Sequence, residues 1–197
     1  MAVVPDPDRR DRSPTTPVAD NRVRIAWAAD AEGVGRVQAR AWTASYGGVL
    51  PPALLAEVDA TGFAEVWREA ITRPPSARHR VLVALSEDIV VGFAATAPNE
   101  DPDATPGDGE VVAFHVDPAT TRAGHGSRLL SAAADTLRQD GFRLGRVWLV
   151  ASDDPQRAFF VSAGWAPDGA HRELDLRGDG SARLRQVRLH ADLGEGA

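Results

Sequence analysis

Residues 115–130, HVDPATTRAGHGSRLL, decide the fold because they join the end of a strand to the start of a helix through a glycine-containing turn. Gly124 and Gly126 stand where the helix is expected to begin. Glycine loses more conformational freedom on folding than any other residue, so two of them here indicate a backbone that something approaches closely. The pattern predicts a strand–turn–helix unit with an accessible backbone at its turn.

The turn itself, RAGHGS at residues 122–127, is suited to hold an anion. A helix N-terminus exposes backbone N–H groups and a partial positive charge, and glycines let a phosphate reach them. As a dinucleotide fingerprint the motif is incomplete, because its third glycine falls on Leu129. A tight turn that binds nothing is the alternative, and the turn alone does not decide between the two.

Composition limits the classes of protein to which the chain can belong. Its 197 residues are 43% hydrophobic and 25% charged, which suits one domain with a substantial core. Cysteine is absent, so disulfides, thiolate metal sites and cysteine nucleophiles are excluded. All the basic residues are arginine, and the lysine-dependent phosphate loop of nucleotide hydrolases is therefore excluded as well.

The charge balance points to a small substrate. A formal net charge of −6 and a pI near 5.3 argue against nucleic acid or an anionic membrane as partner. No run approaches the roughly 20 apolar residues of a membrane helix, and the N-terminus lacks the apolar centre of a secretory signal. We expect a cytoplasmic protein.

The first twenty residues differ from the rest. Residues 1–20 are rich in proline and charge with almost nothing to bury, which predicts a disordered tail. Residues 21–194 are expected to form a single domain. The acidic loop at residues 99–110 is long and rich in Pro and Gly, and we expect it to be mobile.

Periodicity predicts the order of elements in that domain. A strand is followed by two helices, a hairpin, a strand, a helix, a strand, a short helix and a final hairpin. This order predicts an α/β (α+β) fold, with a mixed sheet that carries helices on both faces.

Two stretches resemble motifs of the GNAT superfamily of N-acetyltransferases. FHVDPATTRAGHGSRLL, at residues 114–130, is similar to motif A, in which a V-x-P strand end leads into Q/R-x-x-G-x-G/A. DDPQRAFFVSAGW, at residues 153–165, resembles motif B, and AWTASYGGVLPPALL, at residues 41–55, is similar to the first-helix region of many bacterial members. The resemblance spans residues 22–193, and two motifs at family-like separation are more specific than either alone.

The resemblance implies a mostly antiparallel sheet whose two central parallel strands, 110–117 and 146–152, splay apart. The opening would hold the pantetheine arm of acetyl-CoA. The cofactor-binding residues that the resemblance implies are the strand backbone at Phe114, His115 and Val116, the pyrophosphate turn at Arg122, Ala123, Gly124, His125, Gly126 and Ser127, and the motif B positions Asp153 and Phe160.

The sequence departs from the family pattern in both motifs. In motif A the first Q/R falls on Thr121 and the arginine before the first glycine falls on Ala123, which leaves Arg122 as the nearby cation. In motif B the positions of Asn, Ala and Tyr are occupied by Asp153, Gln156 and Phe160.

The change at the tyrosine position bears on the chemistry. Relatives often use that tyrosine to protonate the departing CoA thiolate, and Phe160 is unable to do so. A thiolate is a comparatively good leaving group, so we expect the missing tyrosine to slow the reaction without abolishing it.

The catalytic residues are inferred from what acyl transfer needs, a neutral amine and a polarised thioester carbonyl. Following the family, the backbone N–H of Val116 would stabilise the oxyanion. Glu110, where relatives often place a carboxylate or histidine, is the candidate base acting through water, with a solvated loop-end carboxylate as the alternative. His115 is the second candidate, but strict alternation puts its side chain opposite Glu110 and favours a packed histidine. The histidine spacings indicate no metal site.

Trp42 and Tyr46 are the candidates for acceptor binding. They lie four residues apart on the first helix, so they share a face, and relatives often line the acceptor pocket with this region. An aromatic pair that packs against the sheet is the alternative. The acidic loop is able to attract a cationic amine, although such loops are usually only solvated.

Together these features predict an N-acyltransferase that transfers an acetyl or longer acyl group from CoA to a primary amine of a small molecule, peptide or protein. The alternatives are a non-catalytic acyl-CoA-binding module or sensor, motivated by Phe160, and a structural domain that binds no CoA. Dimers are common among such proteins, so a homodimer is one candidate, but the sequence does not fix the oligomeric state. The sequence does not identify the acceptor.

Overall fold

The computed structural model describes residues 21–176, 178–180 and 182–194. The strands are β1 (Asn21–Ile25), β2 (Arg80–Ser86), β3 (Ile89–Pro98), β4 (Asp108–Val116), β5 (Leu144–Val150), β6 (Ala166–Asp175) and β7 (Arg183–Asp192). The helices are α1 (Ala31–Tyr46), α2 (Pro52–Leu55), α3 (Ala60–Thr72), α4 (His125–Gln139) and α5 (Asp154–Ser162), with 3-10 turns η1 (Ala28–Asp30) and η2 (Pro118–Thr120).

These elements follow the predicted order, except that the second predicted helix is divided into α2 and α3. The division has a local cause, because Asp59 caps α3 by accepting the N–H groups of Thr61 and Gly62 and so starts a new helix. The predicted tail, residues 1–20, lies outside the described residues. None of the described helices is long and apolar enough to cross a bilayer.

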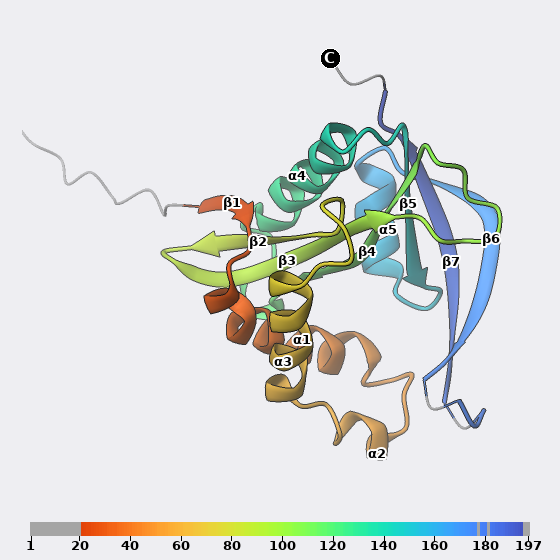
Figure 1. Ribbon diagram of the computed structural model, residues 1–197. Helices are drawn as coiled ribbons and strands as arrows, with labels where there is room; N and C mark the ends of the chain where they lie inside the picture. The colour runs from red at the N-terminus through yellow and green to blue at the C-terminus, as the bar shows by residue number, and fades with distance from the viewer. Residues whose placement is uncertain (1–20, 177, 181, 195–197) are drawn as a thin grey trace, which may run out of the picture.

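The strands form one mixed sheet in the order β1-β2-β3-β4-β5-β7-β6. Helices α1 and α3 cover one face and α4 covers the other (Figure 1). Among the described strands, β4 and β5 form the parallel pair, and the other neighbours are antiparallel. This is the mixed, mostly antiparallel sheet that the sequence predicts.

The parallel pair is short. β4 and β5 are paired from Asp108 and Leu144 as far as Val111 and Val147, although β4 continues to Val116. The register of β4 against β3 also shifts at this point, so that Val112 is an extra residue in β4. Such a bulge bends a strand and increases its twist. The two central strands therefore separate beyond Val111.

Two hydrophobic clusters, one on each face, hold the sheet in place. The cluster under α4 and α5 contains Leu129, Ala133, Leu137 and Phe160, all fully buried. The cluster under α1 and α3 is built on β2 and β3, with Val83 and Phe93 fully buried. α1 crosses α3 closely, because a Cβ on Gly35 would lie 2.7 Å from the backbone nitrogen of Ala64.

The acidic loop is tied to the sheet rather than free. Arg188 of β7 contacts Asp101 at 3.0 Å and Asp103 at 2.7 Å. Arg146 of β5 contacts Asp103 at 2.9 Å and Asp108 at 2.8 Å. We call this set of ion pairs the loop clamp. The expectation of a mobile loop did not include it, because the arginine partners lie on strands far along the chain.

Removing the cation at the centre of the loop clamp should destabilise the fold. The Arg188 side chain is 8% exposed and that of Asp101 is 10% exposed, so Arg188→Met removes the nearest cation from a buried carboxylate. Among the described residues, Asp101 then keeps only neutral hydrogen-bond donors and Arg172, which is 3.7 Å away. We expect a loss of about 3 kcal/mol in the free energy of unfolding at neutral pH, measured by urea denaturation. Arg183→Met, which removes an exposed arginine 3.4 Å from Glu173, should cost less than about 1 kcal/mol.

The difference should also depend on pH. Burial raises the pKa of Asp101, but the hydrogen bonds from Arg188, Asn99 and Trp148 outweigh it and hold the pKa below its ordinary value. A carboxylate with a lowered folded-state pKa contributes stability above its unfolded pKa and loses it as the pH falls through the folded value. The cost of Arg188→Met should therefore shrink below about pH 4. An equal cost at every pH would contradict the electrostatic role.

Candidate functional site

A cavity of about 670 Å³ lies where β4 and β5 separate. Four parts of the chain form its wall: the end of β4, the turn before α4, the start of α5 and the second half of α1. The described residues that line it are Ala41, Ala44, Ser45, Phe114, His115, Val116, Pro118, Thr121, Arg122, Gly124, Gly126, Ser127, Ser152, Asp153, Pro155, Gln156 and Phe159.

The end of β4 turns free backbone groups into this cavity. In an antiparallel pair, alternate residues exchange hydrogen bonds with the partner strand. Asp117 donates its N–H to β3 at 2.8 Å, so His115, two residues earlier, also directs its backbone groups to β3. Phe114 and Val116 therefore point their N–H and C=O groups toward β5, where pairing has ended. Three residues were predicted to contact a ligand through the backbone. Phe114 and Val116 direct their backbone groups to the opening, whereas those of His115 point to β3.

The turn before α4 contains two residues in the left-handed region, a conformation found in turns that bind anions. Gly124, the N-cap of α4, has φ 78° and ψ 4°, and Arg122 also lies in the left-handed region at φ 64°. Such turns converge their N–H groups on one point. Glycine at 124 relieves the backbone strain that a side chain would add there.

Gly126 has a different reason to be glycine. Its φ is not in the left-handed region, and an added Cβ would lie 3.4 Å from Phe159 and 3.6 Å from Val116, which is ordinary contact. A side chain would fit the empty protein but would narrow the cavity between these two residues. The glycine therefore keeps space open for a ligand.

Two arginines stand beside the turn, one of which sequence reasoning missed. Arg122 lines the cavity, as predicted. Arg128 lies one helical turn after Gly124, and its guanidinium donates to the carbonyl of Ala123 at 3.3 Å. Arg128 follows Gly124 by four residues, and this spacing was the sequence signal that would have placed its side chain beside the turn.

The remaining predicted turn residues separate into two groups. Ser127 lines the cavity, while Ala123 and His125 do not. His125 is 5% exposed, and burial, with Arg128 nearby, lowers the pKa of its imidazole.

Motif B forms the opposite wall. Asp153 caps α5 by accepting the backbone N–H of Gln156 at 3.1 Å, and the Gln156 side chain donates to the carbonyl of Phe114 at 3.0 Å. Phe160, predicted to contact a ligand, is fully buried in the core, and Phe159 lines the cavity in its place. The Phe160 ring packs edge-to-face on Phe114, with centroids 5.2 Å apart.

Glu110 lies where β4 still pairs with β5. Its Oε2 accepts a hydrogen bond from the Asn99 side chain at 2.9 Å. Burial raises the pKa of the half-buried Glu110 carboxyl, Asp101 raises it further, and Arg172 and Asn99 oppose the shift. The carboxylate is therefore a stronger base than an exposed glutamate.

The bulge at Val112 corrects the predicted alternation of β4. Val111 and Phe114 pack in the same cluster under α4, which strict alternation forbids. The extra residue between them reverses the pattern, so Glu110 and His115 lie on the same face of the sheet, not on opposite faces.

His115 is packed rather than charged. Its ring lies 5.3 Å from that of Phe93, and burial lowers its pKa to about 4, so the imidazole is neutral at pH 7.

Trp42 and Tyr46 pack on each other with centroids 5.3 Å apart. Neither is part of the cavity wall. Tyr46 is 9% exposed and clusters with Val150 and Leu184, and burial with the charge of Asp153 raises its pKa to about 12. The two rings therefore pack against the sheet, and their role in acceptor binding stays a prediction.

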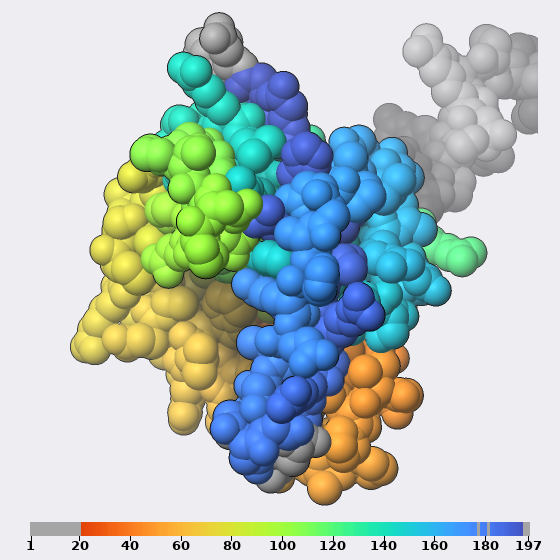
Figure 2. All heavy atoms as spheres, turned by 90° about the vertical axis from the view of Figure 1, so that its right-hand side faces the viewer, coloured from red at the N-terminus to blue at the C-terminus, as the bar shows by residue number. Residues whose placement is uncertain are grey.

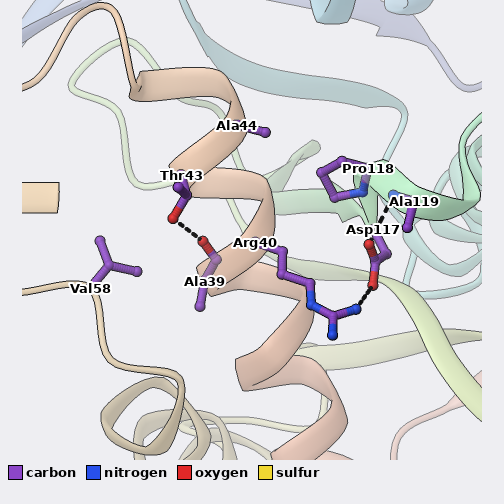
Figure 3. A pocket seen from close by; sticks show the side chains of 8 residues that line it. All are labelled: Ala39, Arg40, Thr43, Ala44, Val58, Asp117, Pro118 and Ala119. Atoms are coloured by element: carbon purple, nitrogen blue, oxygen red, sulfur yellow. Dashed lines mark hydrogen bonds and ion pairs between the residues drawn. The ribbon is translucent and has the colours of Figure 1, made fainter. Parts of the chain in front are cut away.

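A second cavity of about 480 Å³ lies between α1 and η2 (Figure 3). Arg40 of α1 reaches across it to Asp117, at 2.7 Å, and Asp117 also accepts the backbone N–H of Ala119 at 3.0 Å. Ala44 and Pro118 belong to the walls of both cavities. The ion pair fixes the end of β4 to the helix that covers the opening.

Glu110 lies on one face of the sheet, and the loop clamp and β6 border the part of that face around it. Figure 2 looks onto β6, drawn in blue, and shows the surface hollowed between it and the acidic loop, drawn in green. The Trp148 indole donates to Asp101 at 3.0 Å, and the Arg172 guanidinium lies 4.2 Å from the centre of its ring. The described residues hold no group of three or more acidic or histidine side chains suited to a metal ion.

Comparison with known proteins agrees with this geometry. A family model described as the acetyltransferase (GNAT) family matches residues 25–165. A search of curated protein sequences finds no significant match.

Solved structures with the same fold include several acetyltransferases. PaiA N-acetyltransferase from Thermoplasma acidophilum, in complex with coenzyme A, is similar with a TM-score of 0.69 and 17% identity over 87% of this chain and 98% of that chain. YncA, a putative acetyltransferase from Salmonella typhimurium with acetyl-CoA, has a TM-score of 0.65 and 20% identity over 91% and 97%. Ribosomal-protein-alanine N-acetyltransferase from Brucella melitensis has a TM-score of 0.65 and 19% identity over 87% and 99%.

The structural likenesses, at this level of identity, show the fold. The family match covers more than half of the sequence and includes the separating strands and the turn before α4. The chain therefore belongs to the acetyltransferase (GNAT) family.

Proposed function

We propose that the protein is an N-acetyltransferase that transfers the acetyl group of acetyl-CoA to a primary amine. The separation of β4 and β5 beside the cavity of about 670 Å³ carries the proposal, because it leaves backbone groups of a central strand free to bind an amide-containing arm. PaiA and YncA, which share the fold, were solved with coenzyme A and acetyl-CoA.

The donor would be held at two places. The N–H groups at the start of α4, with Arg122 and Arg128 beside them, suit the pyrophosphate, since a helix N-terminus and a left-handed turn both favour an anion. The N–H of Phe114 and the C=O of Val116 suit the amides of the pantetheine arm, since Gln156 already occupies the Phe114 carbonyl. Longer acyl groups are not excluded by these contacts.

The chemistry requires a deprotonated amine. The raised pKa of Glu110 suits it to accept the amine proton through a water molecule. The nitrogen then attacks the thioester carbon, the Val116 N–H stabilises the oxygen that becomes negative, and the C–N bond forms as the C–S bond breaks. Solvent protonates the thiolate in this scheme, because the buried Phe160 has no hydroxyl.

The acceptor is proposed only as a primary amine. A ribosomal-protein-alanine acetyltransferase is among the proteins of similar fold, and small molecules, peptides and protein amines all remain candidates. A homodimer stays a prediction.

A non-catalytic acyl-CoA-binding protein is the second candidate, and Phe160 favours it by removing the tyrosine hydroxyl that relatives often use. Thiol release from acetyl-CoA over a panel of amines separates the two. Release that depends on one amine class identifies an enzyme, whereas CoA binding without release identifies a binding protein.

If Glu110 is the base, Glu110→Gln should lower kcat by about 10²-fold or more while the dissociation constant for acetyl-CoA stays unchanged. The rate of the unaltered enzyme should fall as the pH drops through the raised pKa of Glu110, because the protonated carboxyl accepts no proton. Thiol release as a function of pH measures both. Glu65→Gln, at an exposed glutamate on α3, is the matched control, because Glu65 is not among the charges that shift the Glu110 pKa. Equal rates for both variants would remove Glu110 from the mechanism.

Gly126→Ala should weaken CoA binding without harming the fold. The methyl group meets Phe159 and Val116 at ordinary contact distances, and alanine favours a helix over glycine by about 1 kcal/mol. We expect a similar or higher melting temperature and a dissociation constant for CoA that is about tenfold larger, a change of about 1.4 kcal/mol, by calorimetry. Gly62→Ala, in the first turn of α3, is the control and should leave CoA affinity unchanged. Unchanged affinity in Gly126→Ala would contradict the donor site.

A further inference from the structure

Gln156 crosses the opening between the two walls of the cavity. It lies in the first turn of α5 and lines the cavity, half-buried. Its side-chain nitrogen donates to the carbonyl of Phe114, on β4, at 3.0 Å. In the motif that the sequence resembles, this position is alanine, which is too short to cross and has no hydrogen-bonding group.

The contact replaces a missing bond of the sheet. The Phe114 carbonyl points toward β5, which no longer supplies a backbone N–H at this level. A buried carbonyl without a partner is unfavourable, and Phe114 is 6% exposed. Gln156 supplies the donor from the neighbouring helix.

This bond also sets the direction of the rest of the amide. Only the NH₂ end of a carboxamide is able to donate to a carbonyl, so the orientation of Gln156 is determined by Phe114. Its Oε1 accepts no hydrogen bond from the described residues. The opening therefore contains a fixed amide oxygen, together with the free N–H groups of Phe114 and Val116.

We propose that Gln156 recognises an amide of the pantetheine arm of the acyl donor, an inference that rests on the proposed function. Oε1 would accept the N–H of that amide, and a β4 N–H would donate to its carbonyl. Gln156 thus takes the place of the Phe114 carbonyl as the acceptor that the ligand meets. It is a positioning residue and takes no part in proton transfer.

The surroundings of Gln156 hold it in this position. Its backbone N–H is bound to the Asp153 side chain at 3.1 Å, and Pro155 precedes it at the start of the helix. The next residue, Arg157, pairs with Asp154 and is not part of the cavity wall, which makes Arg157→Ala a control in the same helical turn.

The test compares a ligand that has the arm with one that lacks it. For Gln156→Ala we expect the dissociation constant for CoA to rise about fivefold, the usual effect of one hydrogen bond, and that for 3′,5′-ADP to stay unchanged. Calorimetry measures both ligands on the unaltered protein, Gln156→Ala and Arg157→Ala. The last should bind both like the unaltered protein.

Gln156→Glu adds a pH signature that a structural role would not produce. An ionised carboxylate has no proton to donate to the Phe114 carbonyl, so CoA should bind more weakly than to Gln156→Ala at about pH 7.5. A protonated carboxyl regains the donor, so CoA should bind more tightly to Gln156→Glu than to Gln156→Ala once the pH falls below the glutamate pKa of about 4.3.

The outcomes separate this inference from the proposed function. Binding of CoA by the unaltered protein with equal or tighter binding by Gln156→Ala would overturn the role of Gln156 and leave the proposed function intact. An equal loss for CoA and 3′,5′-ADP would overturn it too, since the effect would then not belong to the arm. No binding of either ligand by the unaltered protein would overturn both.

Discussion

The whole site depends on the early end of hydrogen bonding between β4 and β5. A central strand normally satisfies its backbone groups on both sides, and buried groups left without partners are costly. Here β4 continues to Val116 although its pairing with β5 stops at Val111. The Phe114 and Val116 groups therefore need partners from elsewhere. Gln156 supplies one of them, and the amide groups of a ligand are chemically suited to supply the rest.

The bulge at Val112 connects this separation to the placement of the side chains. By inserting one residue on the β3 side, it bends β4 away from β5 and reverses which residues face α4. Phe114 then joins the core with Val111, and Glu110 and His115 come to the opposite face. Burial raises the pKa of the Glu110 carboxyl and lowers that of the His115 imidazole, so Glu110 has the higher proton affinity of the two. One local irregularity thus shapes both the cavity and the face that carries Glu110.

The sequence predicted what is encoded locally. The order of elements and the turn at Gly124 depend on residues within a few positions of one another, and the structure contains both. The prediction that Glu110 and His115 lie on opposite faces was wrong, because the alternation of one strand does not reveal a bulge. The loop clamp was missed because Arg188 and Asp103 are 85 positions apart. Phe159 lines the cavity instead of Phe160 because of the rotation of α5 about its axis. The sequence, with two adjacent phenylalanines, does not show which of them faces the cavity.

The loop clamp also limits the electrostatic attraction that the acidic loop exerts on a cationic ligand. Asp101 and Asp103 are both paired with Arg188, and Arg146 neutralises Asp103 and Asp108 from the adjacent strand. Their attraction for a distant cation is therefore largely cancelled, and long-range steering by this loop is weak. The loop clamp instead holds the loop in place beside Glu110. Asp101 therefore stays near Glu110 and raises the pKa of its carboxyl, and Asn99, at the start of the same loop, donates a hydrogen bond to that carboxylate. The loop acts on the proton affinity of one carboxylate rather than on the approach of the substrate.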